Sequence, residues 1–207
     1  MAGMFFLGRL GPMSPRNALT WSWLLVWSLV AFIWAFAEAI WFFIIVDVLI
    51  SLAVMRFGVL RAMVPAFAAL LGSLLGGIVL YKWAMVNPET VRELMLTVPG
   101  VPDELLSNAA GYVVVDPLQA MVVGGFTGIP LKVFAATSGN AGLTPVLEFV
   151  EPAAVARFCR FAVVLALSGA LRSMLYSKLR RVGLIRLTLF IWVVFYAWFG
   201  YVFWNLV

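Results

Sequence analysis

The chain has 207 residues, of which 65% are apolar and 11% carry charge. A soluble domain is about half apolar and a quarter charged, and one of this size could not hide so much apolar surface from water. The composition therefore excludes a soluble globular protein and predicts an all-α integral membrane protein.

The charged residues and the missing residue types narrow the function classes. Lys and Arg number 14 against 9 Asp and Glu, and in a membrane protein this excess indicates contact with anionic headgroups rather than nucleic acid. The chain has no histidine and one cysteine, Cys159, so histidine-ligated metals and Ser-His or Cys-His catalysis are excluded. We expect no metal, no cofactor and no enzyme activity.

The first apolar run predicts a span followed by a hairpin. Residues 1–18 are expected to be a short tail, and residues 19–207 a single membrane domain. The run from Leu19 to Met55 is too long for one span, because about 20 residues cross the bilayer core. Glu38 and Asp47 would lie on opposite faces of a straight helix, whereas a turn near 42–43 brings them together. We therefore expect a span at about 17–35 and a re-entrant hairpin at 36–56.

The middle of the chain alternates a span, a polar segment and a second broken run. A span is expected at 60–84, with a glycine-rich stretch at 72–77 that permits close helix packing. The segment 86–116 holds prolines and charges, so we expect a polar connector with short helices at 88–97 and 102–110. Glycines and Pro130 interrupt the next run, which predicts a second hairpin at 117–143.

The last third of the chain predicts two spans joined by a basic loop. The spans are expected at 146–171 and 184–206, and the loop at 178–186. With two hairpins that do not cross, both chain ends would lie on one side and the basic loop on the other. Because positive charge favours the cytoplasm, the ends are expected outside.

Five ionisable residues lie in apolar sequence, and they are the candidate functional residues. Each costs about 2.5–3.5 kcal/mol at mid-membrane on insertion scales, so mutual pairing around a wet cavity is the favoured arrangement. Two neighbouring carboxylates repel when both are ionised, so one of them should hold its proton more tightly than a free carboxyl does, while the nearby cations oppose this shift. The charges could instead hold helices together or extend to an interface. They are Glu38, Asp47, Lys132, Arg157 and Arg160.

The pattern of two broken apolar runs, each followed by a span, is typical of an inverted repeat. Four stretches carry a closer likeness: Glu38-Ala39 with Phe42-Phe43 and Asp47-Val48-Leu49-Ile50; Leu71–Gly77 with Tyr81; Gly125–Phe134 continuing to Ser138-Gly139; and Arg157–Phe161 with Arg172. Through them, residues 30–175 resemble the DedA family, also called the VTT-domain or SNARE-associated Golgi protein family. The third stretch resembles its Thr-x-x-Pro-x-Lys-Val-Phe branch. Thr127 and Lys132 stand where many members have arginine, and the first hairpin lacks the usual prolines.

The resemblance implies two oppositely facing re-entrant hairpins that meet near the midplane. It implies movement of phosphate-bearing lipids between leaflets, by scrambling or flipping, with membrane phospholipids or polyprenyl phosphate as partners. Glu38 and Asp47 would couple transport to protons, and Gly128 and Pro130 would form a hairpin tip. Lys132, Arg157, Arg160 and Thr127 would bind the headgroup.

Two other functions remain open on the sequence. The charged cavity could serve a small solute or an ion, or the protein could be a membrane scaffold that transports nothing. We expect a multi-pass protein of the cell membrane, in the setting of a bacterial inner membrane. The oligomeric state stays open, a homo-oligomer included.

Overall fold

The chain is all-α in the part that the computed structural model describes, residues 15–142 and 145–206. Four helices there are long and apolar enough to cross a membrane: Trp21–Ile40, Val59–Val86, Leu147–Leu175 and Arg181–Val202. These features agree with the predicted fold class and are consistent with a multi-pass membrane protein.

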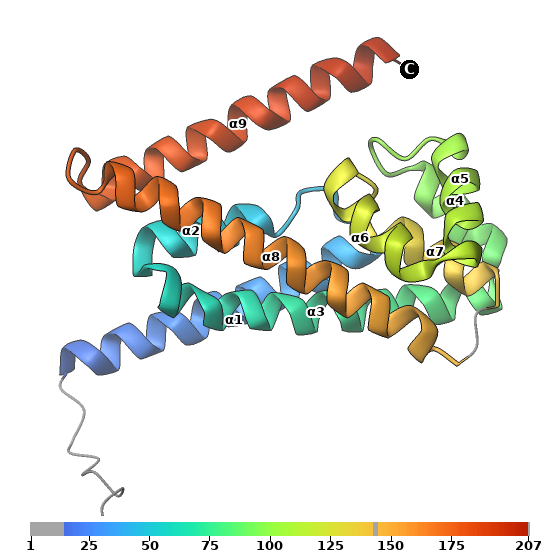
Figure 1. Ribbon diagram of the computed structural model, residues 1–207, viewed down its shortest axis with the longest axis horizontal. Helices are drawn as coiled ribbons and strands as arrows, with labels where there is room; N and C mark the ends of the chain where they lie inside the picture. The colour runs from blue at the N-terminus through green and yellow to red at the C-terminus, as the bar shows by residue number, and fades with distance from the viewer. Residues whose placement is uncertain (1–14, 143–144, 207) are drawn as a thin grey trace, which may run out of the picture.

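Nine helices follow one another in the described ranges (Figure 1). They are α1 (Pro15–Ile40), α2 (Asp47–Phe57), α3 (Val59–Val86), α4 (Pro88–Leu96), α5 (Asp103–Val115), α6 (Pro117–Thr127), α7 (Leu131–Asn140), α8 (Leu147–Leu175) and α9 (Arg181–Leu206). Because α1 begins at Pro15, the predicted tail is at least four residues too long. Residues 1–14 lie outside the described part.

Helix α3 runs the length of the molecule and packs most closely against α1. Gly72 and Gly76 face the backbone carbonyls of Phe32 and Phe36, where a Cβ atom would collide with the carbonyl oxygens. Small residues at this spacing let two helix backbones approach. The predicted packing role of the glycine-rich stretch is therefore confirmed.

The packing also shows that α1 and α3 run in the same direction, with the short α2 returning between them (Figure 1). Trp27 packs against Phe57 at the end of α2, whereas Phe36 lies beside Gly76, well along α3. The start of α1 therefore lies at the same end of the molecule as the α8–α9 loop, and α9 ends at the other end. The sequence analysis expected both ends on one side, but the start of α1 and the end of α9 lie at opposite ends of the described part, because α1 continues to Ile40 before the chain turns.

Neither segment predicted to be a hairpin forms one continuous helix. The chain leaves the helix at residues 41–46, between α1 and α2, and again at 128–130, between α6 and α7. We call these the first break and the second break. Both breaks lie in the interior third of the structure, next to the middle of α8 (Figure 1).

The segment predicted as a polar connector folds onto the bundle. Helices α4 and α5 pack against α7 through buried apolar side chains, among them Val91, Met95, Leu106 and Ala109. The expected helix at 88–97 corresponds to α4, and the one at 102–110 continues as α5 to Val115. This packing fixes α7, and with it the residues that follow the second break.

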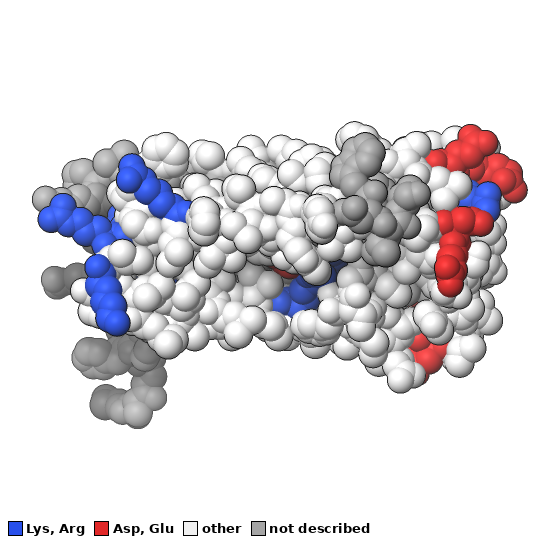
Figure 2. All heavy atoms as spheres, turned by 90° about the horizontal axis from the view of Figure 1, so that it is seen from above, with Lys and Arg blue, Asp and Glu red and all other residues white. Residues whose placement is uncertain are grey.

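On the face that Figure 2 shows, charged side chains gather at the two ends of the molecule, and the surface between them is largely uncharged. The middle of each long helix exposes large apolar side chains, such as Ile33, Phe67, Leu167 and Val193. A belt of this kind suits the hydrocarbon core of a bilayer. A hollow in the belt shows Lys and Arg atoms (Figure 2), which leads to the candidate site.

Candidate functional site

The site is built around the first break, where the chain must leave a helix in apolar surroundings. Trp41 and Phe42 donate their backbone N–H groups to the carbonyl of Ala37 at 2.9 and 2.8 Å. From there to α2 the backbone has lost the helical pattern of hydrogen bonds. Unpaired backbone groups cost several kcal/mol where water is excluded, so partners from elsewhere are required.

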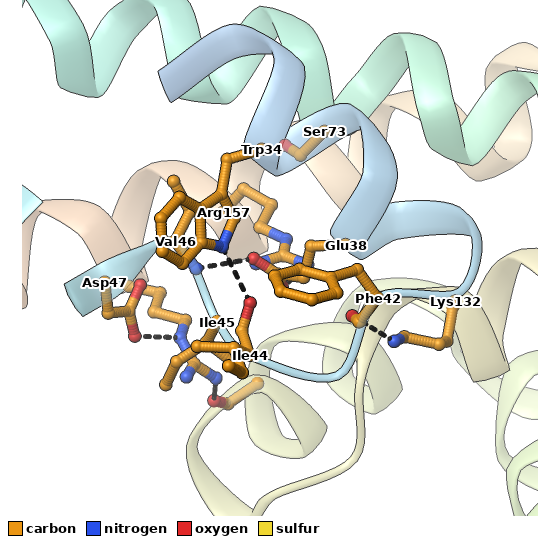
Figure 3. Close-up of polar contacts among 12 residues, drawn as sticks. Trp34, Glu38, Phe42, Ile44, Ile45, Val46, Asp47, Ser73, Lys132 and Arg157 are labelled. Carbon is orange, nitrogen blue, oxygen red and sulfur yellow. Dashed lines mark hydrogen bonds and ion pairs between the residues drawn. The ribbon is translucent and has the colours of Figure 1, made fainter. Parts of the chain in front are cut away.

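Three carbonyl groups of the first break are bonded by two side chains. Lys132, the second residue of α7, places its Nζ atom 2.7 Å from the Phe42 oxygen and 3.3 Å from that of Trp41 (Figure 3). The indole nitrogen of Trp34 donates to the carbonyl of Ile44 at 2.8 Å. A cation at the end of α1 also opposes the partial negative charge of that helix terminus.

Two N–H groups of the first break are also bonded by side chains. The Ile45 N–H donates to the Tyr196 hydroxyl at 2.9 Å, and the Val46 N–H donates to Glu38 Oε2 at 2.8 Å. Glu38 therefore caps α2 from the last turn of α1, and Asp47 occupies the first position of α2. The negative charges of these two carboxylates stabilise the partial positive charge at the N-terminus of α2.

Two arginines of α8 neutralise these carboxylates. Arg157 Nη2 lies 2.8 Å from Glu38 Oε1, and Arg160 Nε lies 2.8 Å from Asp47 Oδ2. Arg160 also donates through Nη1 to the carbonyl of Gly125 in α6. Glu38, Asp47 and Arg157 are 3%, 3% and 5% exposed, so both ion pairs are largely withdrawn from solvent. Because both pairs are removed from water, the loss of either partner would leave a buried charge without a counter-charge.

The two ion pairs confirm the predicted mutual pairing of the embedded charges. The further prediction, that repulsion between Glu38 and Asp47 makes one of them hold its proton more tightly, stays a prediction. In the structure each has its own arginine, and Glu38 uses both oxygens in hydrogen bonds. Asp47 Oδ1 is buried, and no described residue bonds it. The two ion pairs therefore join α8 to α1 and α2.

A cavity of about 620 Å³ lies beside the first break and joins these residues. All five ionisable candidates line it: Glu38, Asp47, Lys132, Arg157 and Arg160. The sequence-based prediction that the carboxylates face a cavity shared with Lys132 and Arg157 is met. Three cations and two carboxylates give the lining one excess positive charge, and that excess favours an anion.

The second break forms another wall of the cavity, which Thr127, Gly128 and Pro130 line. Thr127 ends α6, and its hydroxyl donates to the carbonyl of Val123 at 3.1 Å. Gly128 has φ +102°, and the N–H groups of Gly128 and Ile129 both donate to the Gly124 carbonyl. Thr127 is exposed and uses its hydroxyl locally, so it contributes less to the charged centre than the sequence suggested.

Sequence reasoning missed the wall that α9 forms. Hydropathy predicted only a span at 184–206. In the structure, Phe195, Tyr196, Trp198 and Phe199 line the cavity, and Tyr196 bonds the first break. The available signal was the spacing of Trp192 and Tyr196, four residues apart on one helix face. Hydropathy alone could not reveal that this face meets the charged centre.

Comparison with known proteins does not assign a function to this site. No protein-family model, curated protein or solved structure matches the chain. Any function must therefore be argued from the cavity and the residues around it.

Proposed function

We propose that this protein moves phosphate-bearing lipids between the two leaflets of a membrane, as a scramblase or flippase of the DedA type. The observation that carries the proposal is the cavity at the first break, which combines one excess positive charge with a wall of apolar side chains. Arginine and lysine are the residues that bind phosphate oxygens most strongly. An intramembrane cavity with this lining suits a phosphate headgroup.

The rim of the cavity is suited to acyl chains. Phe126 of α6, Val163 of α8 and Trp198 of α9 all line it and are 54%, 41% and 61% exposed. A lipid that places its headgroup among the cations could therefore keep its tails against apolar side chains. A path for a soluble solute would not need this apolar rim, and that difference favours a lipid over a small solute or an ion.

The proposal includes two re-entrant hairpins, as an inverted repeat. Helices α2, α6 and α7 have 11, 11 and 10 residues, or about 15–17 Å each at 1.5 Å per residue. The hydrocarbon core is about 30 Å thick, so none of the three can cross it. The two breaks would then be the hairpin tips, and protein and the cavity would shield their non-helical backbone from lipid.

The proposal also includes an orientation that differs from the one the sequence suggested. Basic residues gather near the α2–α3 and α8–α9 connections, at the end of the molecule where α1 begins. They are Arg56, Arg61, Arg172, Lys178 and Arg180. Positive charge near spans favours the cytoplasm. The start of α1 should therefore face the cytoplasm and the end of α9 the opposite side. Reaction of a cysteine introduced at Arg180 with an impermeant reagent added outside intact cells would contradict this orientation.

A scaffold role is the second candidate, because the buried charges already have protein partners. Lys132, Arg157 and Arg160 each bond a carbonyl or a carboxylate. If these contacts serve only to hold the helices together, the protein needs no ligand. A scaffold predicts that its function survives joint neutralisation of Glu38 and Lys132 in a protein that still folds.

Reconstitution separates the two candidates. Vesicles of a neutral glycolipid would carry the purified protein and either fluorescent phosphatidylglycerol or a tail-matched fluorescent glycolipid. We expect faster transfer of the phosphatidylglycerol between leaflets than in protein-free vesicles. Arg160→Gln should slow this transfer, whereas Arg61→Gln, the same change outside the cavity, should leave it unchanged. Transfer no faster than in protein-free vesicles would reject the lipid-transport proposal.

A further inference from the structure

Helix α9 meets the rest of the molecule along one narrow stripe. Leu184, Thr188, Trp192 and Tyr196 follow one another at four-residue spacing, which places them on one face of the helix. Two hydrogen bonds hold this face to the first hairpin. Trp192 donates through Nε1 to Ser51 Oγ at 2.9 Å, and the Ile45 N–H donates to Tyr196 Oη at 2.9 Å. Of the two α9 residues, only Tyr196 lines the cavity.

The hydroxyl group of Tyr196 has an unused capacity to donate a hydrogen bond. A phenolic oxygen can accept one hydrogen bond while it donates another. Tyr196 accepts from Ile45, and no described residue accepts the proton of Tyr196. The other hydroxyl in the described lining, that of Thr127, already donates to the Val123 carbonyl. Tyr196 thus offers the cavity a neutral donor that its own fold does not use.

The surroundings hold this donor in place. The tyrosine ring makes edge-on contacts with Phe43 at 6.1 Å and Phe195 at 5.3 Å between ring centroids. The hydrogen bond from Ile45 fixes the oxygen beside the first break. The same cavity holds Lys132, Arg157 and Arg160, whose charges would attract the anion that the hydroxyl could bond. Fixed donors bind without a further loss of rotamer freedom.

We propose that Tyr196 donates a hydrogen bond to a phosphate oxygen of the lipid headgroup and so helps to determine which headgroup the cavity accepts. The inference rests on the proposed lipid-transport function and adds a specificity-determining residue from α9 to it. It separates two kinds of donor. The arginines supply charge while bound to carboxylates, and Tyr196 supplies a neutral, directional bond.

The test compares Tyr196→Phe with Ser51→Ala. The first variant keeps the aromatic ring and removes the hydroxyl. The second removes the other polar tie between α9 and the first hairpin, outside the cavity. Both loosen α9, and only the first removes a donor from the cavity. The transfer rate of phosphatidylglycerol would be measured as a function of its mole fraction in neutral glycolipid vesicles.

We expect Tyr196→Phe to raise the half-saturating mole fraction about tenfold, the factor that corresponds to about 1.4 kcal/mol. Ser51→Ala should leave the half-saturating fraction unchanged, whatever its effect on the maximal rate. An unchanged half-saturating fraction in Tyr196→Phe, with active wild type, would overturn the role of Tyr196 and leave the proposed function intact. If the wild-type protein transfers no phosphatidylglycerol, the proposed function fails, and the role of Tyr196 fails with it.

A second replacement covers the case in which Tyr196→Phe does not fold. Incorporation of 3-fluorotyrosine at position 196 keeps the ring and the oxygen, and it makes the hydroxyl a stronger donor and a weaker acceptor. A donor to phosphate should then lower the half-saturating fraction. A group that serves only as the acceptor for Ile45 should leave it unchanged or raise it, and either result would contradict the inference.

Discussion

The two breaks differ in where their backbone groups find hydrogen-bond partners. In the first break, residues 41–46, the partners are side chains from α1, α7 and α9, such as Glu38, Lys132 and Tyr196. In the second break, residues 128–130, Gly128 takes a left-handed conformation, and its N–H and that of Ile129 return to the carbonyl of Gly124. The first break depends on distant residues, whereas the second is closed by its own backbone.

This difference indicates which break could respond to a ligand. A phosphate group in the cavity would compete for the cations that bond the first break or its flanking carboxylates. The second break keeps its closing hydrogen bonds whatever binds beside it, because no charged side chain makes them. Substitutions in the charged network should therefore affect stability far more than substitutions at the glycines of the second break.

The largest effect is expected from Arg157→Leu. This change leaves Glu38, which is 3% exposed, without its buried partner. Removal of one partner from a buried ion pair costs about 3–5 kcal/mol. The free energy of unfolding, measured in mixed micelles with a denaturing detergent, should fall by that amount. The double variant Glu38→Leu/Arg157→Leu should recover part of the loss, and a double variant less stable than the single one would refute the pairing argument.

A smaller loss is expected from Lys132→Met, which removes the ammonium group and keeps an unbranched side chain. The carbonyls of Trp41 and Phe42 would lose their partner, but no buried charge would be left unpaired. A hydrogen bond to a charged group contributes about 1.5–3 kcal/mol, so the free energy of unfolding should fall within that range. Lys82→Met, at an exposed position of α3, is the matched control. Equal stability of the two variants would show that Lys132 does not hold the first break.

Sequence reasoning located both breaks but explained only the second. Glycines and Pro130 mark the second break, because such residues favour left-handed or non-helical backbone. The first break has no such local signal, since its residues are Trp41-Phe42-Phe43-Ile44-Ile45-Val46. Only the spacing of Glu38 and Asp47 pointed to a turn there. Two of its partners, Lys132 and Tyr196, lie about 90 to 150 residues away, and no local pattern encodes such contacts.

The same limit applies to the charges and to the course of α1. Five embedded ionisable residues could be assigned to one cavity, because isolated charges are costly in a membrane. Which carboxylate meets which arginine depends on the rotation of α8 against α1 and α2, which single-sequence periodicity does not determine. Likewise, hydropathy placed a span near 17–35, but the helix continues to Ile40, and this extension sets the direction of α1 relative to α3.

Gly128→Ala tests the self-contained closure of the second break. Gly128 has φ +102°, where a side chain is strained, but no atom lies within 4 Å of the position that a Cβ would take. The loss should therefore reflect backbone strain alone, about 1–2 kcal/mol in the free energy of unfolding. Unfolding in the same micelles measures it. A loss as large as that of Arg157→Leu would mean that the second break also depends on long-range packing.

Gly125→Ala completes the comparison with the smallest expected effect and the opposite sign. Gly125 lies inside α6 without a positive φ, and a Cβ there would also meet no atom within 4 Å. Alanine favours a helix interior over glycine by about 0.5–1 kcal/mol, so the variant should be slightly more stable than wild type. The carbonyl of Gly125 accepts a hydrogen bond from Arg160 and is unaffected by an added methyl group.

The same variant also tests the headgroup path, because the methyl group would stand at the cavity wall. An unchanged or raised stability together with slower phospholipid transfer would place this path beside α6. A loss of stability would instead show that α6 packs more tightly at Gly125 than its open surroundings indicate.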